Sequence, residues 1–69
     1  MSSIEIELWP CQYRVKCTAA GCPNLARVIV RRIAEGGAPL GQSELCNKDA
    51  RATTAAVRAD GVPVYEMRR

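Results

Sequence analysis

The chain has 69 residues, of which 48% are hydrophobic and 25% charged, and its formal net charge is +3. This length predicts a single domain, residues 1–69, and a domain of this size buries only about 60% of the surface of its unfolded chain. The core must be built from small aliphatic side chains, because the sequence contains no Phe, one Trp and two Tyr. Such a domain is marginal unless a metal ion, disulfides or a second subunit stabilise it.

The first residues favour a cytoplasmic protein. Glu5 and Glu7 stand where a secretion signal would carry positive charge, and no apolar segment follows them. No stretch approaches the roughly 18 apolar residues that a membrane-spanning helix needs. We therefore expect no membrane partner and a reducing compartment. In that setting four cysteines are metal ligands or free thiols more often than disulfides.

The first half of the chain predicts three strands. Apolar and acidic residues alternate from Ile4 to Trp9, a pattern typical of a half-buried strand, and Pro10 marks its end. Alternation resumes over residues 11–17, which predicts a second strand with one polar face. Residues 25–33 are rich in β-branched side chains and predict a third strand. The segment between the second and third strands must form a turn.

The second half predicts a loop, a short strand, one helix and a last short strand. Glycines and a proline cluster over residues 35–39, which indicates the loop. Asn47 is a favourable N-cap for the helix, and Gly61 is placed to end it in a left-handed conformation. In chain order these elements cover residues 35–39, 40–45, 46 or 47 to about 59, and 62–65.

The spacing of the cysteines predicts a zinc site. Cys17 and Cys22 are up to about 17 Å apart in an extended chain, whereas two sulfurs on one zinc ion lie about 3.8 Å apart. The intervening residues must therefore fold back, and Gly21 tolerates the positive φ that this turn needs. Cys46 and Asp49 are three residues apart at the start of the helix, so they share one helix face. We expect these four residues to hold one Zn²⁺ ion.

Cys11 is the alternative fourth ligand. Along a straight strand it would lie roughly 20 Å from Cys17, too far to share a metal ion, so Asp49 is favoured and Cys11 is interpreted as a small buried apolar residue. Two other interpretations stay open for the whole set, namely reduced thiols without metal and a disulfide. For Asp49 the alternative is an acid that complements the helix dipole and touches no metal.

The C-x4-C pair, followed by Leu45-Cys46 and then Asp49, resembles small bacterial treble-clef zinc-finger proteins. These carry a C-x4-C pair, a middle strand region and an L-C-x2-H pair that opens a helix. The resemblance spans about residues 14–58, within a zinc-finger core of about 12–59. It implies an α+β treble-clef-like domain stabilised by zinc: a β-hairpin carrying the cysteine knuckle, one main helix and short flanking strands. It also implies Cys17, Cys22, Cys46 and Asp49 as ligands, with Asp standing where the family carries His.

The sequence predicts a binding protein rather than an enzyme. It contains no His for general base catalysis and no phosphate-binding loop, and a closed four-ligand zinc site leaves no position for water. We expect a non-catalytic zinc-binding interaction module with a protein partner that the sequence does not identify. The sequence does not specify the oligomeric state. The alternative is a small protein that binds nucleic acid weakly through a basic hairpin face made of Arg14, Lys16, Arg27, Arg31 and Arg32.

Overall fold

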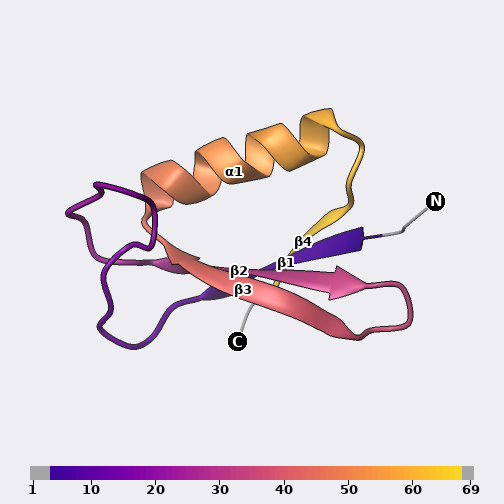
Figure 1. Ribbon diagram of the computed structural model, residues 1–69, viewed down its shortest axis with the longest axis horizontal. Coiled ribbons are helices and arrows are strands. Elements are labelled where there is room, and N and C mark those ends of the chain that lie inside the picture. Colours follow the sequence, from indigo (N-terminus) through magenta and orange to yellow (C-terminus); the bar gives the residue numbers. More distant parts are fainter. Residues whose placement is uncertain (1–3, 68–69) are drawn as a thin grey trace.

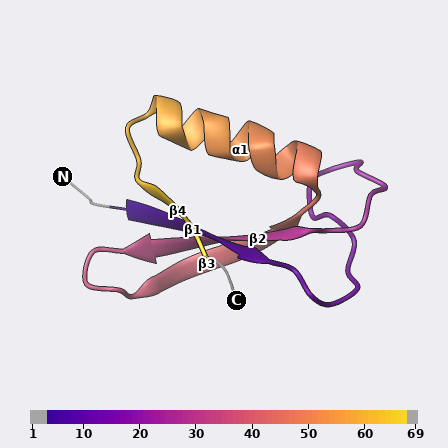
Figure 2. The ribbon, with the colours of Figure 1, turned by 180° about the vertical axis from the view of Figure 1, so that it is seen from behind.

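The computed structural model describes residues 4–67 and shows a small α+β fold with one helix over one face of a mixed sheet (Figure 1). Seen from behind, the helix again lies on one side of the sheet (Figure 2). The sheet has four strands in the order β3-β2-β1-β4. The elements are β1 (Ile4–Pro10), β2 (Val28–Ala34), β3 (Pro39–Leu45), α1 (Asn47–Ala59) and β4 (Val64–Glu66).

Three of the strands form an antiparallel unit, and the fourth joins it in parallel. β2 pairs antiparallel with both β1 and β3, whereas β4 pairs parallel with β1. The backbone N–H of Ile6 donates to the carbonyl of Pro63 at 2.9 Å, and the N–H of Met67 donates to Leu8 at 2.8 Å. The helix thus links the β3 edge of the sheet to the opposite edge.

The core lies between α1 and the sheet. The alternation predicted for the first strand is confirmed, because Ile6 is 3% exposed whereas Glu5 is exposed. Cys17 and Cys46 belong to the central cluster of buried side chains, so the candidate site adjoins the hydrophobic core. The buried members of this cluster are Ile6, Cys17, Val30, Leu45, Cys46 and Ala50.

The strand predicted over residues 11–17 is wrong. This segment is part of a long connection between β1 and β2, and its only ladder contact is an isolated antiparallel bridge between Lys16 and Leu25. Its alternating side chains face the core only in part, since Cys17 is 6% exposed whereas Tyr13 is 51% exposed. β1 pairs directly with β2 instead. The predicted hairpin around the cysteine turn is present without regular strands: besides this bridge, the N–H of Ala26 donates to the carbonyl of Val15 at 2.8 Å, and the N–H of Cys17 donates to that of Asn24 at 2.9 Å.

The helix occupies the predicted range, but its N-cap is Cys46 rather than Asn47. Cys46 has extended backbone angles, φ −70° and ψ 166°, and its side chain accepts the N–H of Asp49. Gly61 ends the helix with φ 79°, as predicted. Within residues 4–67, this helix of 13 residues is neither long nor apolar enough to cross a membrane.

Candidate metal site

A tight turn brings Cys22 back towards Cys17. The N–H of Cys22 donates to the carbonyl of Ala19 at 3.1 Å, and the N–H of Cys17 donates to Asn24 at 2.9 Å. Gly21 takes φ 74°, the conformation that the sequence predicted for this position. The turn therefore presents the two thiols from one short loop.

Hydrogen bonds attach this loop to the end of β3. Both the backbone N–H and the side-chain hydroxyl of Thr18 donate to the carbonyl of Glu44, at 2.8 and 3.1 Å. Leu45 is the last residue of β3, and Cys46 follows it directly. The two cysteine-bearing segments, far apart in the sequence, are thereby held side by side.

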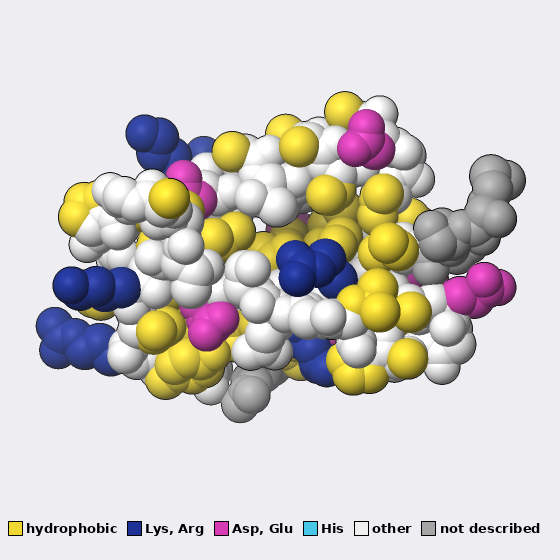
Figure 3. Space-filling model, viewed as in Figure 1, with side chains coloured by type: hydrophobic (Ala, Val, Ile, Leu, Met, Phe, Trp, Pro, Cys, Tyr) yellow, Lys and Arg dark blue, Asp and Glu magenta, His cyan; other side chains and the backbone are white. Residues whose placement is uncertain are grey.

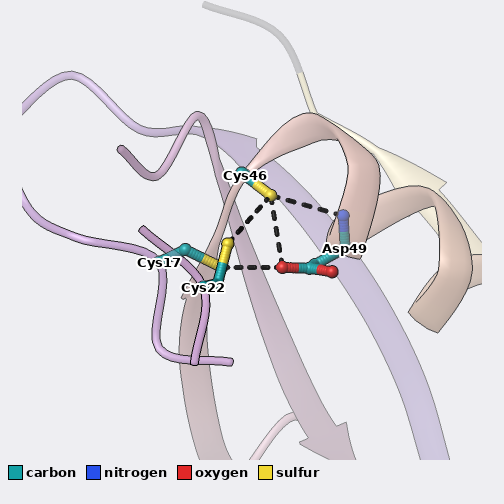
Figure 4. Close-up of side chains that lie close together, drawn as sticks. All are labelled: Cys17, Cys22, Cys46 and Asp49. Atoms are coloured by element: carbon teal, nitrogen blue, oxygen red, sulfur yellow. Dashed lines mark hydrogen bonds between the residues drawn. The ribbon is translucent and has the colours of Figure 1, made fainter. Parts of the chain in front are cut away.

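The start of α1 supplies the other two donors. Because Cys46 is the N-cap, Asp49 is the third residue of the helix, and its N–H donates to the sulfur of Cys46 at 3.5 Å. An N-cap acceptor bonded to the third helical N–H is the usual way to satisfy a free donor at a helix start. Here a sulfur takes the place of the oxygen, and the carboxylate turns towards the cysteine turn (Figure 4).

Four side chains converge on one point. The sulfur of Cys17 lies 3.1 Å from Oδ2 of Asp49, and the sulfur of Cys46 lies 3.2 Å from the same oxygen. The sulfurs of Cys22 and Cys46 are 3.7 Å apart, close to the roughly 3.8 Å expected for two sulfurs on one tetrahedral zinc ion. One donor atom from each residue lies within 4.8 Å of all the others. These four residues could hold one metal ion.

The thiols and the carboxylate shift one another's pKa. Hydrogen bonds from Cys17, then Cys22 and Cys46, lower the pKa of Asp49. The N–H of Asp49 lowers the pKa of Cys46. For Cys22, the backbone N–H of Asn24 lowers the pKa, but contacts with Asp49, Cys17 and Cys46 together with desolvation raise it to about 12. Hydrogen bonds within the cluster therefore lower the pKa of Asp49, which favours its charged form, and the raised pKa of Cys22 favours its neutral form.

The site is partly closed to solvent. Cys17 is 6% and Cys46 4% exposed, whereas Cys22 and Asp49 are half-buried. The buried pair connects the site to the core, and the half-buried pair gives an ion a route of entry.

Asn24 is a contributor that the sequence did not reveal. Its side-chain amide lies 3.8 Å from the sulfur of Cys46 and is placed to donate to it, while its backbone also bonds to Cys17 and Cys22. The sequence suggested only a residue suited to a turn exit. Its position two residues after the second cysteine is the one signal that was available. Amide donors stabilise the thiolate form that binds a metal ion.

Cys11 stands apart from the cluster. Its thiol donates to the carbonyl of Tyr13 at 3.4 Å, and it does not belong to the described group of possible metal donors. It is half-buried rather than fully buried. The geometry therefore agrees with the preference for Asp49 as the fourth donor.

The residues proposed for a basic hairpin face do not share one strand face. Arg31 and Arg32 are consecutive on β2, so their side chains leave opposite faces of the sheet, and Arg32 lies over Gly41 of β3. Arg14 and Lys16 are exposed on the β1–β2 connection, and Arg27 precedes β2. On the face seen in Figure 3, the positive groups are scattered rather than gathered.

Comparison of the chain with protein-family models, with curated proteins and with solved structures found no match.

Proposed function

We propose that this protein is a small, non-catalytic zinc-binding interaction module of the treble-clef type, which acts in the cytoplasm. The observation that carries the proposal is the convergence of three sulfurs and one carboxylate oxygen from two distant segments. A turn bearing two cysteines, set against a helix that opens with the other two donors, is the arrangement by which the sequence resembles treble-clef zinc fingers.

The donor chemistry favours zinc. Thiolates select soft or borderline ions, so three sulfurs argue against magnesium and calcium. Structural zinc sites are almost always four-coordinate, and Cys17, Cys22, Cys46 and Asp49 supply four donors. With all four bound, no position remains for a reacting water, and so we propose no catalytic role.

The proposed ion would supply stability that the core lacks. The connection between β1 and β2 has little regular structure, and the metal would tie it to the start of α1. Structural zinc contributes on the order of 10 kcal/mol to the folding of small domains. An ion with this role stabilises the fold and takes no part in a reaction. We therefore propose that the surface of the folded domain binds a protein partner.

Elemental analysis of the full chain, purified without chelator, tests the proposal. We expect one equivalent of zinc, together with loss of circular dichroism signal when a strong chelator removes it. Cys22→Ser should lower the zinc content, whereas the matched variant Cys11→Ser should retain it. A metal-free protein with intact secondary structure would refute the zinc role.

A further inference from the structure

A groove runs along the side of the molecule where α1 passes over the end of β1. It consists of two adjoining hollows that share Leu8, Val28 and Glu66 as lining residues. The first, of about 380 Å³, lies beneath α1, and the second, of about 500 Å³, lies beside the last residues of β1, where Trp9 and Met67 line it. Both hollows are open to solvent, so what they could accept depends on the residues that line them.

The groove exists because the helix does not fill the space above β1. Among the described residues, the backbone of α1 comes close to β2, β3 and β4 but not to β1. The helix side that lines the groove carries small residues, Ala50, Thr54 and Ala55. Leu8 and Val28 are consequently left half-exposed as an apolar floor.

Three arginines surround this floor. Arg51 and Arg58 lie about two turns apart on one side of α1, and Arg27 lies just before β2. All three are exposed. Glu66 is the only acid that lines the groove among residues 4–67, so the site carries excess positive charge.

We propose that this arginine groove, formed by Leu8, Val28, Ala55 and the three arginines, binds an acidic peptide segment with a large apolar side chain. The apolar side chain would cover Leu8 and Val28, where α1 offers only small residues. Neighbouring carboxylates would pair with Arg51, Arg58 and Arg27, whose planar guanidinium groups match carboxylate geometry.

A peptide fits this groove better than a nucleic acid does. The floor is aliphatic and provides no platform of successive aromatic rings for stacking bases. The single Trp lies at one end, and its Nε1 donates to Glu7 at 3.0 Å. Glu66 would also repel a phosphate chain, whereas a peptide can place an uncharged residue beside it.

The inference rests on the interaction role proposed above and names the class of partner. The groove residues are distinct from the four proposed metal donors, so the two ideas can fail separately. If the groove binds nothing while one zinc is present, the partner class is wrong and the zinc role stands. If the purified chain is folded, lacks zinc and still binds peptide, the zinc role is wrong and the partner class stands.

The test uses ¹⁵N-labelled full-length protein as purified. We would titrate it with a pool of ten-residue peptides in which aspartate, glutamate, leucine and phenylalanine are placed at random. Amide shifts should change at Leu8, Val28 and Ala55. A pool with lysine in place of the acids should leave them unchanged, and a mixed-sequence oligonucleotide should affect them less than the acidic pool does.

Charge reversal provides the matched comparison. The double variant Arg51→Glu and Arg58→Glu should bind the acidic pool about tenfold more weakly, with zinc content and circular dichroism unchanged. Arg14→Glu with Lys16→Glu makes the same charge change outside the groove and should keep the affinity. Equal loss in both variants, no amide response in the groove, or a stronger response to the oligonucleotide would overturn the proposal.

Discussion

The sulfur of Cys46 accepts the backbone N–H of Asp49 while lying 3.2 Å from the carboxylate of the same residue. One pair of residues therefore both starts the helix and forms half of the candidate metal site. Metal binding would therefore be coupled to helix initiation through this pair, because a thiolate is a better acceptor for the helix N–H than a thiol is.

Replacing Asp49 tests its place in the site. Asp49→Ala should weaken zinc binding by at least the roughly 10- to 100-fold that loss of an outer-shell partner costs, because it removes a direct donor. Asp49→His should tighten binding, since an imidazole nitrogen completes a Cys3His set, one of the usual structural zinc sites. Competition with a coloured chelator measures both, and Asp60→Ala at the other helix end is the control. An unchanged affinity in Asp49→Ala, with a fall in Cys11→Ser, would make Cys11 the ligand.

Replacing Asn24 tests the amide donor beside Cys46. Asn24→Ala should weaken zinc binding by about tenfold, because the thiolate loses a hydrogen bond that favours its charged form. The same competition assay applies. Asn47→Ala is the matched control, since it removes an exposed amide at the same helix end without a described contact to a sulfur. Equal effects of the two substitutions would show that Asn24 has no special role.

Zinc affinity should rise with pH. Without metal the pKa of Cys22 is about 12, so its thiol is protonated near neutral pH and zinc must displace the proton. The affinity therefore falls as the solution is acidified, by about tenfold per pH unit for each proton released. Calorimetry in buffers of different ionisation enthalpy counts those protons. Binding without proton release would contradict this thiol chemistry.

The conformation of Gly21 should contribute measurably to stability. Its φ of 74° suits glycine, and a Cβ there would meet no atom within 4 Å, so the cost of Gly21→Ala is purely conformational. We expect a loss of about 1 kcal/mol in the free energy of unfolding, measured by urea denaturation of the metal-loaded protein. Gly21→Asn should lose less, because Asn tolerates this region better. An unchanged free energy of unfolding in Gly21→Ala would show that the turn can adopt another backbone conformation without cost.

Nucleic acid binding should be weak and should depend only moderately on salt. Arg31 and Arg32 leave opposite faces of β2, so a single duplex can engage only part of the predicted basic set. With two phosphates neutralised, log affinity should fall with log salt with a slope of about −2. Titration of labelled oligonucleotides at several salt concentrations measures this slope. Tight, sequence-selective binding at high salt would instead favour the nucleic acid function.

Secondary structure was predicted correctly from the sequence where the apolar residues of a local pattern pack against the core. Alternation around Ile6 and the β-branched run around Val30 became central strands, and the helix ended at Gly61 as expected. Spacing also predicted which four donors converge, because a glycine turn and a helix start each bring two side chains together locally. The same reasoning failed at Tyr13, where alternation had no buried surface behind it.

What escaped prediction depended on contacts between distant segments. The role of Asn24 requires Cys46 to be beside it, and sequence spacing does not reveal that neighbour. The cap at Cys46 displaced Asn47 because a sulfur, rather than the usual side-chain oxygen, accepted the helix N–H. The groove arose where small residues of α1 pass over Leu8, a relationship that only the packing of the helix on the sheet defines.

The parallel pairing of β4 with β1 has a consequence for the order in which the fold forms. All of β2, β3 and α1 lie between Ile6 and its partner Val64, so this pairing closes a long loop and carries a correspondingly large entropic cost. The four proposed metal donors all lie between positions 17 and 49, inside that loop, and bringing them together closes a shorter stretch of chain. A folding chain should therefore assemble its cysteine cluster first, and β1 should gain its last neighbouring strand afterwards.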